Sequence, residues 1–454
     1  MLFALSLLGC KEAPDSDVPT PDVPVETADT AVERPNVLIL LADDLGVDNV
    51  GVYGVHPHHA NTPTIDALAA EGMRFTTTWA TPSCSPARAQ VLTGRHGRRY
   101  GMGIRIDMGP SGAPFKLREE EFTLGELART AGYSTSFVGK WHLNHFAADW
   151  ELAPRVQGFD WFAISGGNLP ITSSGQLGEY YHWERNENGV IAFSNTYATT
   201  AQVDDALSRI ESMPEPWLLV VAFNAPHEPF QPPPPALHTL GPVVGQPIPV
   251  RYRAAVEAMD TEIGRLLEAL TPEQRATTYV VFVGDNGTDR AAILPPLDPA
   301  HGKLSVFEGG INVPLLVSGP GVRPGETQAL VHVVDLLPTI AEAAGAKPRA
   351  ELDGVSFLDV LADPKRSGRR EFVYVERFHP LGGGPFDLEL QAIRDERYKL
   401  IVDKKGRKTL YDLKGRFDDG EGTDASRVKG AERTAVQRLE TELERIERTA
   451  TYAY

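Results

Sequence analysis

Four short runs of apolar residues, rich in Val, Ile and Leu, punctuate the first two thirds of the chain. They lie at 37–42, 134–138, 217–223 and 279–284. Runs of this length and composition are typical of strands that are buried on both faces of a parallel sheet. We therefore predict four central strands.

Between these runs the apolar residues take the spacing of helices. Helical patterns cover 62–72, 123–132 and 251–270, and the last repeats apolar residues along one face. Strands that alternate with helices predict an α/β fold with a mainly parallel sheet. The segment PHEPFQPPPP, at 226–235, has too many prolines for regular structure and is predicted to be a surface loop.

After about residue 345 the pattern changes. The segments EFVYVER, LQAIRDERYKLIVD and KTLYDL alternate in part, which predicts a small antiparallel sheet, and 431–449 has the apolar stripe of a final helix. We therefore divide the body of the chain into an α/β domain over 34–345 and a C-terminal α+β subdomain over 346–454.

The N-terminal segment differs from the rest. The run MLFALSLLGC resembles the lipobox of a bacterial lipoprotein signal peptide, although no Lys or Arg precedes it, and it is too short to span a bilayer. We assign 1–10 as a lipoprotein-type signal peptide and expect Cys10 to carry the lipid anchor. Residues 11–33, acidic and rich in proline, are predicted to be a disordered linker. These features predict a periplasmic or cell-surface lipoprotein of bacterial type.

The charge of the chain limits its partners. The net charge is −17, so we expect no binding to nucleic acid and no membrane contact except through an anchor at Cys10. One segment is locally basic, with Arg95, His96, Arg98, Arg99 and Arg105. It is either a solvated loop or part of an anion pocket.

Polar residues follow each predicted strand. Ligands of open parallel sheets bind beyond the carboxyl ends of the strands, so these residues are expected to share one site. Oxygen ligands favour Ca²⁺, with Mg²⁺ or Mn²⁺ as alternatives, and disfavour zinc. The oxygen-bearing residues are Asp43, Asp44, Asp285 and Asn286, and the nitrogen-bearing ones that follow strands are Lys140, His142 and His227.

Cys84 precedes a predicted helix in the segment SCSPARAQVLTG. Ser85 is suited to the N-cap, Pro86 to the first helical position and Gly94 to the end. A helix N-terminus attracts negative charge, and Arg88 lies four residues on, so it faces the same side. From the residues alone, the cysteine is either a small buried hydrophobe or a thiolate nucleophile.

The motif Cys84-Ser-Pro-Ala-Arg88 followed by Leu-Thr-Gly-Arg95 resembles the signature of the sulfatase family. The resemblance extends over roughly residues 34–415 and implies an alkaline-phosphatase-like α/β sandwich with a smaller C-terminal subdomain. Further segments resemble the family in their usual order: RPNVLILLADDLG, NTPTIDALAAEGMRF, GKWHL, NAPHEPF, VFVGDNG, HGKLSVFEGGINVPLLV and VVDLLPT.

The resemblance implies a chemistry and a role for each site residue. A formylglycine-generating maturation enzyme would oxidise Cys84 to formylglycine. Its hydrate would attack the sulfur of a sulfate ester, and its second hydroxyl would then expel sulfate. Asp43, Asp44, Asp285, Asn286 and residue 84 would hold the cation.

The remaining roles implied by the resemblance belong to basic residues. Arg88 would stabilise the hydrate, and Lys140 would contact both the hydrate and the sulfate. His142 would be the base for sulfate release. His227 and Lys303 would contact sulfate oxygens and assist the leaving oxygen.

The function predicted is hydrolysis of the sulfate ester of a small molecule or glycan. The alternative is a phosphonate monoester or phosphodiester hydrolase of the same superfamily, which can share the cysteine motif. A non-catalytic binding protein is disfavoured because Cys84, Arg88, Lys140 and His142 are all present.

Overall fold

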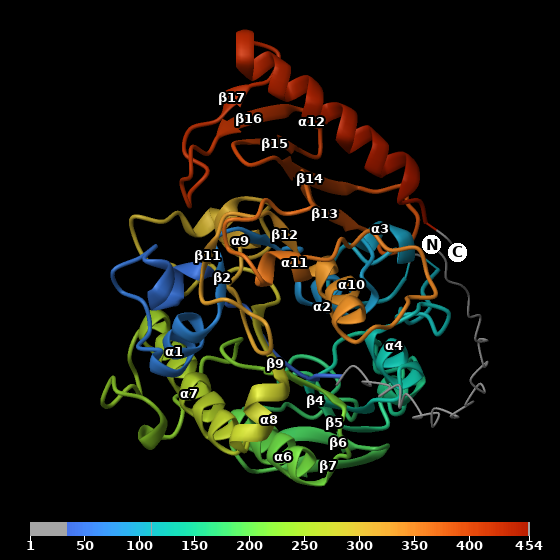
Figure 1. Ribbon diagram of the computed structural model, residues 1–454, viewed down its shortest axis with the longest axis vertical. Coiled ribbons are helices and arrows are strands. Elements are labelled where there is room, and N and C mark those ends of the chain that lie inside the picture. Colours follow the sequence, from blue (N-terminus) through green and yellow to red (C-terminus); the bar gives the residue numbers. More distant parts are fainter. Residues whose placement is uncertain (1–33, 110, 453–454) are drawn as a thin grey trace, which may run out of the picture. The chain divides into compact units, whose positions relative to one another are not determined.

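The four predicted strands lie side by side in the middle of one large sheet (Figure 1). They run parallel, and Ile39 on β1 is level with Val220 on β8 and Val281 on β9. Their order and bounds are β9 (Thr278–Gly284), β1 (Asn36–Ala42), β8 (Trp217–Ala222) and β4 (Ser134–Lys140). The predicted core of the fold is confirmed.

The sheet continues beyond these strands on both sides. In the described part of the chain it has ten strands, in the order β11-β2-β10-β9-β1-β8-β4-β5-β6-β7. Strand β5 extends the parallel part, whereas β10, β6 and β7 run antiparallel to their inner neighbours. The outer strands are β11 (Gly325–Thr327), β2 (Met73–Phe75), β10 (Leu315–Ser318), β5 (Trp161–Ser165), β6 (Trp183–Glu187) and β7 (Val190–Ser194).

Helices cover both faces of this sheet, because successive side chains of a strand point to opposite faces. Val37, Ile39 and Leu41 pack against α2, α4 and α10, whereas Leu38 and Leu40 pack against α1, α6 and α7. The bounds are α1 (Pro63–Glu71), α2 (Cys84–Thr93), α4 (Leu124–Thr130), α6 (Ala198–Ser212), α7 (Ile248–Glu268) and α10 (Leu336–Ala343).

The predicted helices over 62–72, 123–132 and 251–270 correspond to α1, α4 and α7. Helix α4 begins at a capping box in which Thr123 and Glu126 satisfy each other's backbone N–H groups. Shorter helices occur at α3 (Gly97–Tyr100), α5 (Ala153–Val156), α8 (Pro272–Thr277), α9 (Glu308–Ile311) and α11 (Leu358–Leu361). A two-stranded parallel pair joins β3 (Thr78–Trp79) to β12 (Val331–His332).

The C-terminal part forms the predicted antiparallel sheet and final helix. Leu439 and Leu443 of α12 (Gly430–Thr449) pack on one face of the sheet, and the other face packs on Trp79 and Val306. The strands are β13 (Val373–His379), β14 (Leu388–Arg394), β15 (Tyr398–Val402), β16 (Lys408–Asp412) and β17 (Thr423–Asp424).

The structure is a computed structural model that describes residues 34–109 and 111–452. The predicted signal peptide and linker lie outside the described residues. From Arg34 onward the chain forms one compact unit, and the division at residue 345 stays a prediction.

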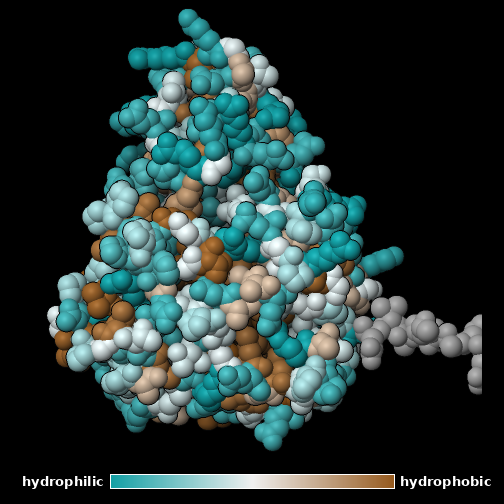
Figure 2. Space-filling model, turned by 60° about the vertical axis from the view of Figure 1, so that its left-hand side comes forward, coloured by the Kyte–Doolittle hydropathy of each residue, from teal (hydrophilic) through white to brown (hydrophobic). Residues whose placement is uncertain are grey.

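The face shown in Figure 2 is mostly hydrophilic, with hydrophobic residues in separate groups, as is usual for a folded protein. None of the helices in the described ranges is both long enough and apolar enough to cross a bilayer.

Candidate active site

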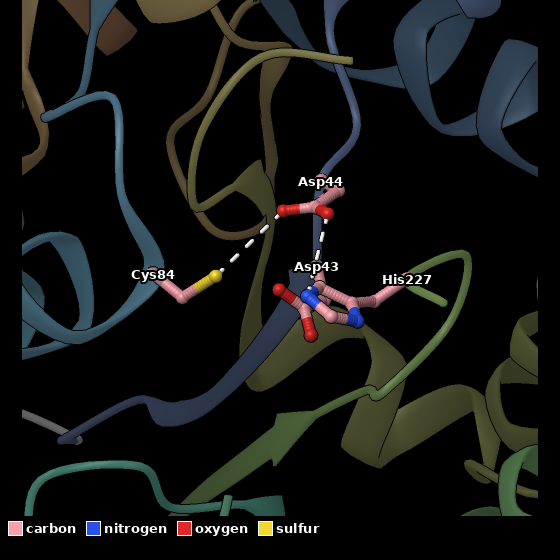
Figure 3. Close-up of side chains that lie close together, drawn as sticks. All are labelled: Asp43, Asp44, Cys84 and His227. Atoms are coloured by element: carbon pink, nitrogen blue, oxygen red, sulfur yellow. Dashed lines mark hydrogen bonds and ion pairs between the residues drawn. The ribbon is translucent and has the colours of Figure 1, made fainter. Parts of the chain in front are cut away.

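Four ligand-type side chains converge beyond the carboxyl end of the sheet (Figure 3). They are Asp43, Asp44, Cys84 and His227, and one ligand atom from each lies within 4.8 Å of the others. All four side chains are buried. Asp43 and Asp44 follow β1 directly, His227 comes from the loop after β8, and Cys84 comes from α2.

Asp44 has an unusual backbone conformation for a non-glycine residue. Its φ is 63°, in the left-handed region, where strain is tolerated only if the surroundings fix it. The Asp44 backbone N–H donates to Asp285 Oδ1 at 3.0 Å, and the Tyr252 hydroxyl donates to the Asp44 carbonyl at 2.6 Å. These bonds aim the Asp44 carboxylate at the cluster.

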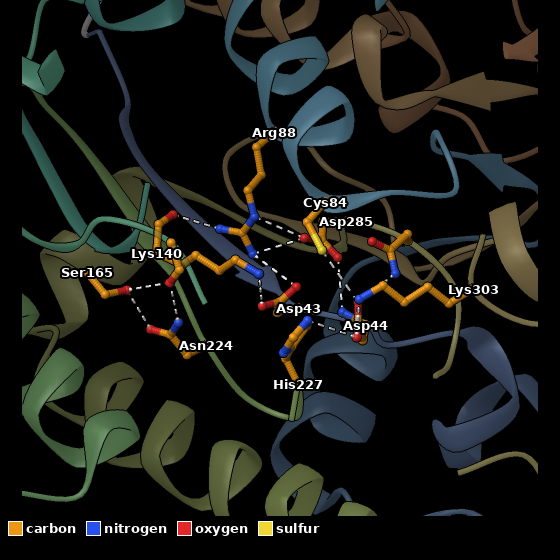
Figure 4. Close-up of polar contacts among 12 residues, drawn as sticks. Asp43, Asp44, Cys84, Arg88, Lys140, Ser165, Asn224, His227, Asp285 and Lys303 are labelled. Carbon is orange, nitrogen blue, oxygen red and sulfur yellow. Dashed lines mark hydrogen bonds and ion pairs between the residues drawn. The ribbon is translucent and has the colours of Figure 1, made fainter. Parts of the chain in front are cut away.

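The Asp44 carboxylate is the centre of the polar contacts (Figure 4). Asn286 Nδ2 donates to Oδ1 at 2.8 Å, and Lys303 Nζ donates to Oδ2 at 2.6 Å. His227 Nε2 lies 3.6 Å from Oδ2. Three residues that are far apart in the sequence therefore meet on one carboxylate.

Asp43 is paired with cations in the same way. Lys140 Nζ donates to Asp43 Oδ2 at 2.5 Å, and Arg88 Nη2 lies 3.6 Å from Oδ1. Burial alone would raise the pKa of Asp43, but Lys140, with smaller effects from His227 and Arg88, lowers it well below its ordinary value. The carboxylate is therefore ionised.

Helix α2 begins two residues earlier than predicted. Ser83 is at the N-cap position and Cys84 is the first helical residue, so the assignment of Ser85 as N-cap and Pro86 as first residue is wrong. The Ser85 hydroxyl instead accepts a bond from the Ile106 N–H at 3.0 Å. The predicted end is confirmed, since Gly94 has φ 65° and its N–H bonds to the Gln90 carbonyl.

The Cys84 sulfur lies at the helix N-terminus, 3.7 Å from Asp44 Oδ1. Burial raises the pKa of the Cys84 thiol well above its ordinary value, and the nearby Asp43 carboxylate raises it further. The side chain is therefore a neutral thiol. A thiolate nucleophile, one of the two interpretations from sequence, does not fit this environment.

Arg88 lies on the same side of α2 as Cys84, as its spacing predicts. Its Nε donates to Asp285 Oδ2 at 3.0 Å and its Nη1 donates to the Lys140 carbonyl at 2.7 Å. Burial and the neighbouring Asp43 raise the pKa of Asp285 to about 7, although Arg88 opposes this. Asp285 thus depends on Arg88 for its charge.

Three basic side chains line the remaining sides. Burial and the charge of Lys303 lower the pKa of His227 to about 4, and burial with Lys140 and Arg88 lowers that of His142 well below its usual range. Both imidazoles are therefore neutral. Burial alone would lower the pKa of Lys303, but Asp44 raises it well above the ordinary value, so the ammonium is charged.

The donor atoms of this site fit a hard cation. Asp43 Oδ1 and Asn286 Oδ1 are buried and have no hydrogen-bond partner in the described structure. Buried polar atoms usually have partners, and oxygen atoms suit Ca²⁺. His227 belongs to the cluster of four ligand-type side chains, whereas Asp285 does not. The two Asp285 oxygens instead accept hydrogen bonds from the Asp44 N–H and from Arg88.

A second layer of polar residues joins Asn224, the amide that the sequence places after a central strand, to Ser165 and Gln202, which the sequence analysis missed. Asn224 Oδ1 accepts bonds from Ser165 Oγ at 3.1 Å and from Gln202 Nε2 at 2.6 Å. Ser165 ends β5, and Gly167 lies against the His142 ring. The apolar run at 161–165 is a fifth strand signal that could have located this layer.

The basic run at 95–105 is mostly structural. Arg95 pairs with Glu121, Arg98 with Glu376 and Glu389, and Arg99 with Asp353. Arg105 is exposed, and no carboxylate of the described residues lies within ion-pair distance of it. Most of these arginines therefore buttress the region around α2 and the C-terminal sheet.

The fold and site define an enzyme that acts on an anionic ester, with buried cations and carboxylates at the carboxyl edge of a parallel sheet. The sulfatase family model matches residues 35–346, and the model described as "N-sulphoglucosamine sulphohydrolase, C-terminal" matches residues 300–449. The chain belongs to the sulfatase family and is a sulfuric ester hydrolase.

The chain is similar to several named sulfatases over most of its length. It is 32% identical to human N-acetylgalactosamine-6-sulfatase over 381 residues, which covers 76% of this chain and 69% of the relative. It is 29% identical to rat arylsulfatase G over 434 residues, 84% of this chain and 78% of the relative.

The fold also matches solved structures. The crystal structure of Ps i-CgsB has a TM-score of 0.77 and 25% identity, and the match covers 92% of this chain and 95% of that chain. A second structure of Ps i-CgsB is a complex with k-i-k-neocarrahexaose. The predicted α/β sandwich with a C-terminal subdomain is confirmed.

Proposed function

We propose that this sulfatase hydrolyses sulfate esters through a formylglycine formed from Cys84, assisted by a divalent cation. The observation that carries the proposal is the position of Cys84, a buried neutral thiol at the start of α2 that contacts Asp44. A neutral thiol in this environment is a poor nucleophile. Formylglycine would supply a hydrated aldehyde there, with one hydroxyl for attack and a second for sulfate release.

We propose that Asp43, Asp44, Asp285, Asn286 and residue 84 hold the cation, which we expect to be Ca²⁺, with Mg²⁺ or Mn²⁺ as alternatives. The partnerless oxygens of Asp43 and Asn286 support this set. A bound cation would act as a Lewis acid on the nucleophile and the sulfate. His227 belongs to the cluster with Asp43, Asp44 and Cys84, so it is close enough to these side chains to serve as a further cation ligand or to contact sulfate.

The basic residues of the site are suited to a negatively charged transferring group. Lys140, Arg88 and Lys303 place three positive charges around Asp43 and Asp44. In a buried site such charges stabilise developing negative charge more strongly than they would in water. We assign Arg88 to stabilising the nucleophile, Lys140 to both nucleophile and sulfate, and Lys303 with His227 to sulfate oxygens and the leaving oxygen.

His142 is assigned as the base for sulfate release. Its imidazole is held neutral, so it can accept a proton, and its Nδ1 is buried without a partner among the described residues. Its positive φ of 57° and its N–H bond to the Gly166 carbonyl at 3.1 Å fix its position next to Lys140.

We infer that the substrate is a sulfated saccharide. The support is the names of similar proteins, which include an N-acetylgalactosamine-6-sulfatase and a protein solved with a carrahexaose. The partners would be this saccharide and the maturation enzyme that modifies Cys84. The location would be the periplasm or cell surface, through a lipid on Cys10.

The test combines mass spectrometry with turnover. Protein co-produced with a formylglycine-generating enzyme is expected to show a peptide mass in which the Cys84 thiol has become an aldehyde, and to hydrolyse an aryl sulfate. The Cys84→Ala variant is expected to lose this activity at least about 10³-fold while keeping the same melting temperature. An unmodified thiol in a fully active preparation would refute the proposal. Faster turnover of an aryl phosphodiester than of an aryl sulfate would favour a phosphodiesterase.

A further inference from the structure

Two arginines beside the site have no carboxylate to neutralise them. Arg290 follows the β9 loop that carries Asp285, and Arg377 lies on β13 of the C-terminal sheet. No Asp or Glu in the described ranges comes within ion-pair distance of either guanidinium. By contrast, Arg95, Arg98 and Arg99, which lie near α2 and the C-terminal sheet, are all paired with carboxylates.

Both arginines donate hydrogen bonds to the backbone of the segment that contains Lys303. Arg290 Nε donates to the Lys303 carbonyl at 2.8 Å, and Arg377 Nη1 donates to the Leu304 carbonyl at 2.7 Å. Because these carbonyls belong to adjacent residues, the two guanidinium groups lie close together. Arg377 points toward the first part of the chain because it shares a strand face with Val373 and Val375, which pack there.

This segment connects the arginines to the reacting groups. Lys303 Nζ contacts Asp44, and the Leu304 N–H donates to the Pro82 carbonyl at 2.9 Å, two residues before Cys84. Leu304 has a φ of 69°, a strained conformation that the contacts on both sides hold in place. The pair therefore lies next to the site, beyond the sulfate-contacting groups.

The charges of the pair are uncompensated and partly accessible. Arg290 is exposed, and Arg377 is half-buried with an Nε that has no hydrogen-bond partner in the described structure. Burial and the charge of Arg290 lower the pKa of Arg377. Two like charges held together cost free energy, which an anion between them would recover.

We propose that Arg290 and Arg377 bind a second anionic group, a sulfate or a carboxylate, on the saccharide whose sulfate ester is cleaved at residue 84. Guanidinium groups match both anions by donating two parallel hydrogen bonds. The inference rests on the proposed function and narrows its substrate class to saccharides with at least two negative charges. It gives the C-terminal sheet a direct role in specificity through Arg377.

The test compares three probes with the same scissile group. The first is N-acetylglucosamine 6-sulfate, which has a neutral N-acetyl group, the second is glucosamine-2-N,6-O-disulfate, and the third is an N-acetylated 6-sulfated hexosamine linked to a uronic acid. For each, kcat/KM is measured with the native enzyme and with Arg290→Gln, Arg377→Gln and the double variant. The readout is the ratio of kcat/KM for each dianionic probe to that for the monosulfated probe.

We expect each single variant to lower this ratio about 10-fold, and the double variant more than about 50-fold, because each removes charge-assisted bonds to the second anion. A loss confined to the disulfated probe identifies a sulfate as the ligand, and one confined to the third probe identifies a carboxylate. Equal losses for all three probes, or an unchanged ratio, would overturn the proposal.

The matched control is Arg323→Gln. Arg323 is also exposed and also lacks a carboxylate partner among the described residues. It follows the end of β10, which pairs with the start of β9, so it lies at the opposite end of the strands from the site. In Arg323→Gln the ratio of kcat/KM for the dianionic probes to that for the monosulfated probe should stay unchanged. This result would exclude an effect of net charge. Arg377→Lys is expected to recover only part of the ratio because it keeps the charge but loses the paired donors.

A binding measurement separates this inference from the proposed function. In the Cys84→Ala background, calorimetry should show that the disulfated probe binds about 10-fold more weakly when Arg377 is replaced by Gln. This difference does not depend on turnover, so it stands even if formylglycine chemistry is refuted. If the affinity is the same with and without Arg377, the second-anion site is refuted.

Discussion

At the scale of single residues, the site is a set of buried charges that neutralise one another. Asp43, Asp44, Lys140 and Asp285 have no solvent exposure, and Arg88 has 3%. Removing one partner of a buried pair leaves the other charge uncompensated, which is costly. The site should therefore be sensitive to changes that remove a charge without changing shape.

The first prediction concerns Asp285→Ala. This change removes a predicted cation ligand and the partner of Arg88, so bound divalent metal and aryl sulfate turnover should both fall by at least about 100-fold. Metal content is measured by elemental mass spectrometry. Asp204→Ala is the control because Asp204 pairs with Arg265 at 2.8 Å on an exposed part of α6. Full metal content in Asp285→Ala would contradict the ligand assignment.

The second residue prediction concerns pH. The Asp353 carboxylate accepts bonds from Arg99 Nε at 2.8 Å, Arg99 Nη2 at 2.7 Å and the His96 N–H at 2.8 Å. Burial alone would raise the pKa of Asp353, but these neighbours lower it to about 2 from an ordinary 3.8. Because the folded pKa is the lower one, the stabilisation is present above pH 3.8 and is lost as the pH falls toward 2.

Asp353→Asn is therefore expected to lower the free energy of unfolding by about 2 kcal/mol at neutral pH. The difference from the native protein should shrink as the pH falls from about 4 toward 2. Chemical denaturation at several pH values measures it. A difference that is constant across this range would show that hydrogen bonding, and not charge, sets the effect.

At the scale of elements, the spacing of apolar residues was enough to predict a helix or strand that is buried on one face or on both faces. The stripe of Val436, Leu439, Leu443 and Ile446 predicted α12, and the four apolar runs predicted the central strands. Periodicity did not fix the start of α2, because Ser83 and Ser85 are equally good caps and the Ser85 hydroxyl is used by Ile106, a tertiary contact.

The element prediction is that Leu439→Ala destabilises the C-terminal sheet and helix by about 2–5 kcal/mol, because Leu439 is buried between α12 and the sheet. Glu444→Ala, on the exposed face of the same helix, should change stability by less than about 0.5 kcal/mol. Thermal unfolding compares the two. Equal melting temperatures for both variants would mean that α12 does not stabilise the fold through this contact.

At the scale of the whole molecule, a chain with a net charge of −17 still places five basic side chains at and beside one site. Arg88, Lys140 and Lys303 form the inner group, and Arg290 with Arg377 lies next to it. An anionic substrate is therefore attracted locally, since exposed charges farther than about 8 Å away are screened at physiological salt. The overall acidity does not oppose binding of a sulfated substrate.

The prediction at this scale concerns attachment to a membrane. If Cys10 is lipidated, Cys10→Ala should move the protein from the membrane fraction to the soluble fraction of a bacterial cell, with no change in aryl sulfate turnover per molecule. Cys84→Ala is the control because it should stay in the membrane fraction while losing turnover. Membrane retention of Cys10→Ala would contradict the anchor.

The sequence by itself determined the α/β class, the central strands, the final helix and the residues at the strand ends. This information is local, because burial imposes a periodicity and the family motifs are contiguous. Only the tertiary structure decided which atoms meet. It brings Asn286, Lys303 and His227 to the Asp44 carboxylate. It pairs Arg95, Arg98 and Arg99 with carboxylates but leaves Arg290 and Arg377 without one among the described residues. Most of those relations join residues from different parts of the sequence, and they depend on how the sheet and loops place side chains in space.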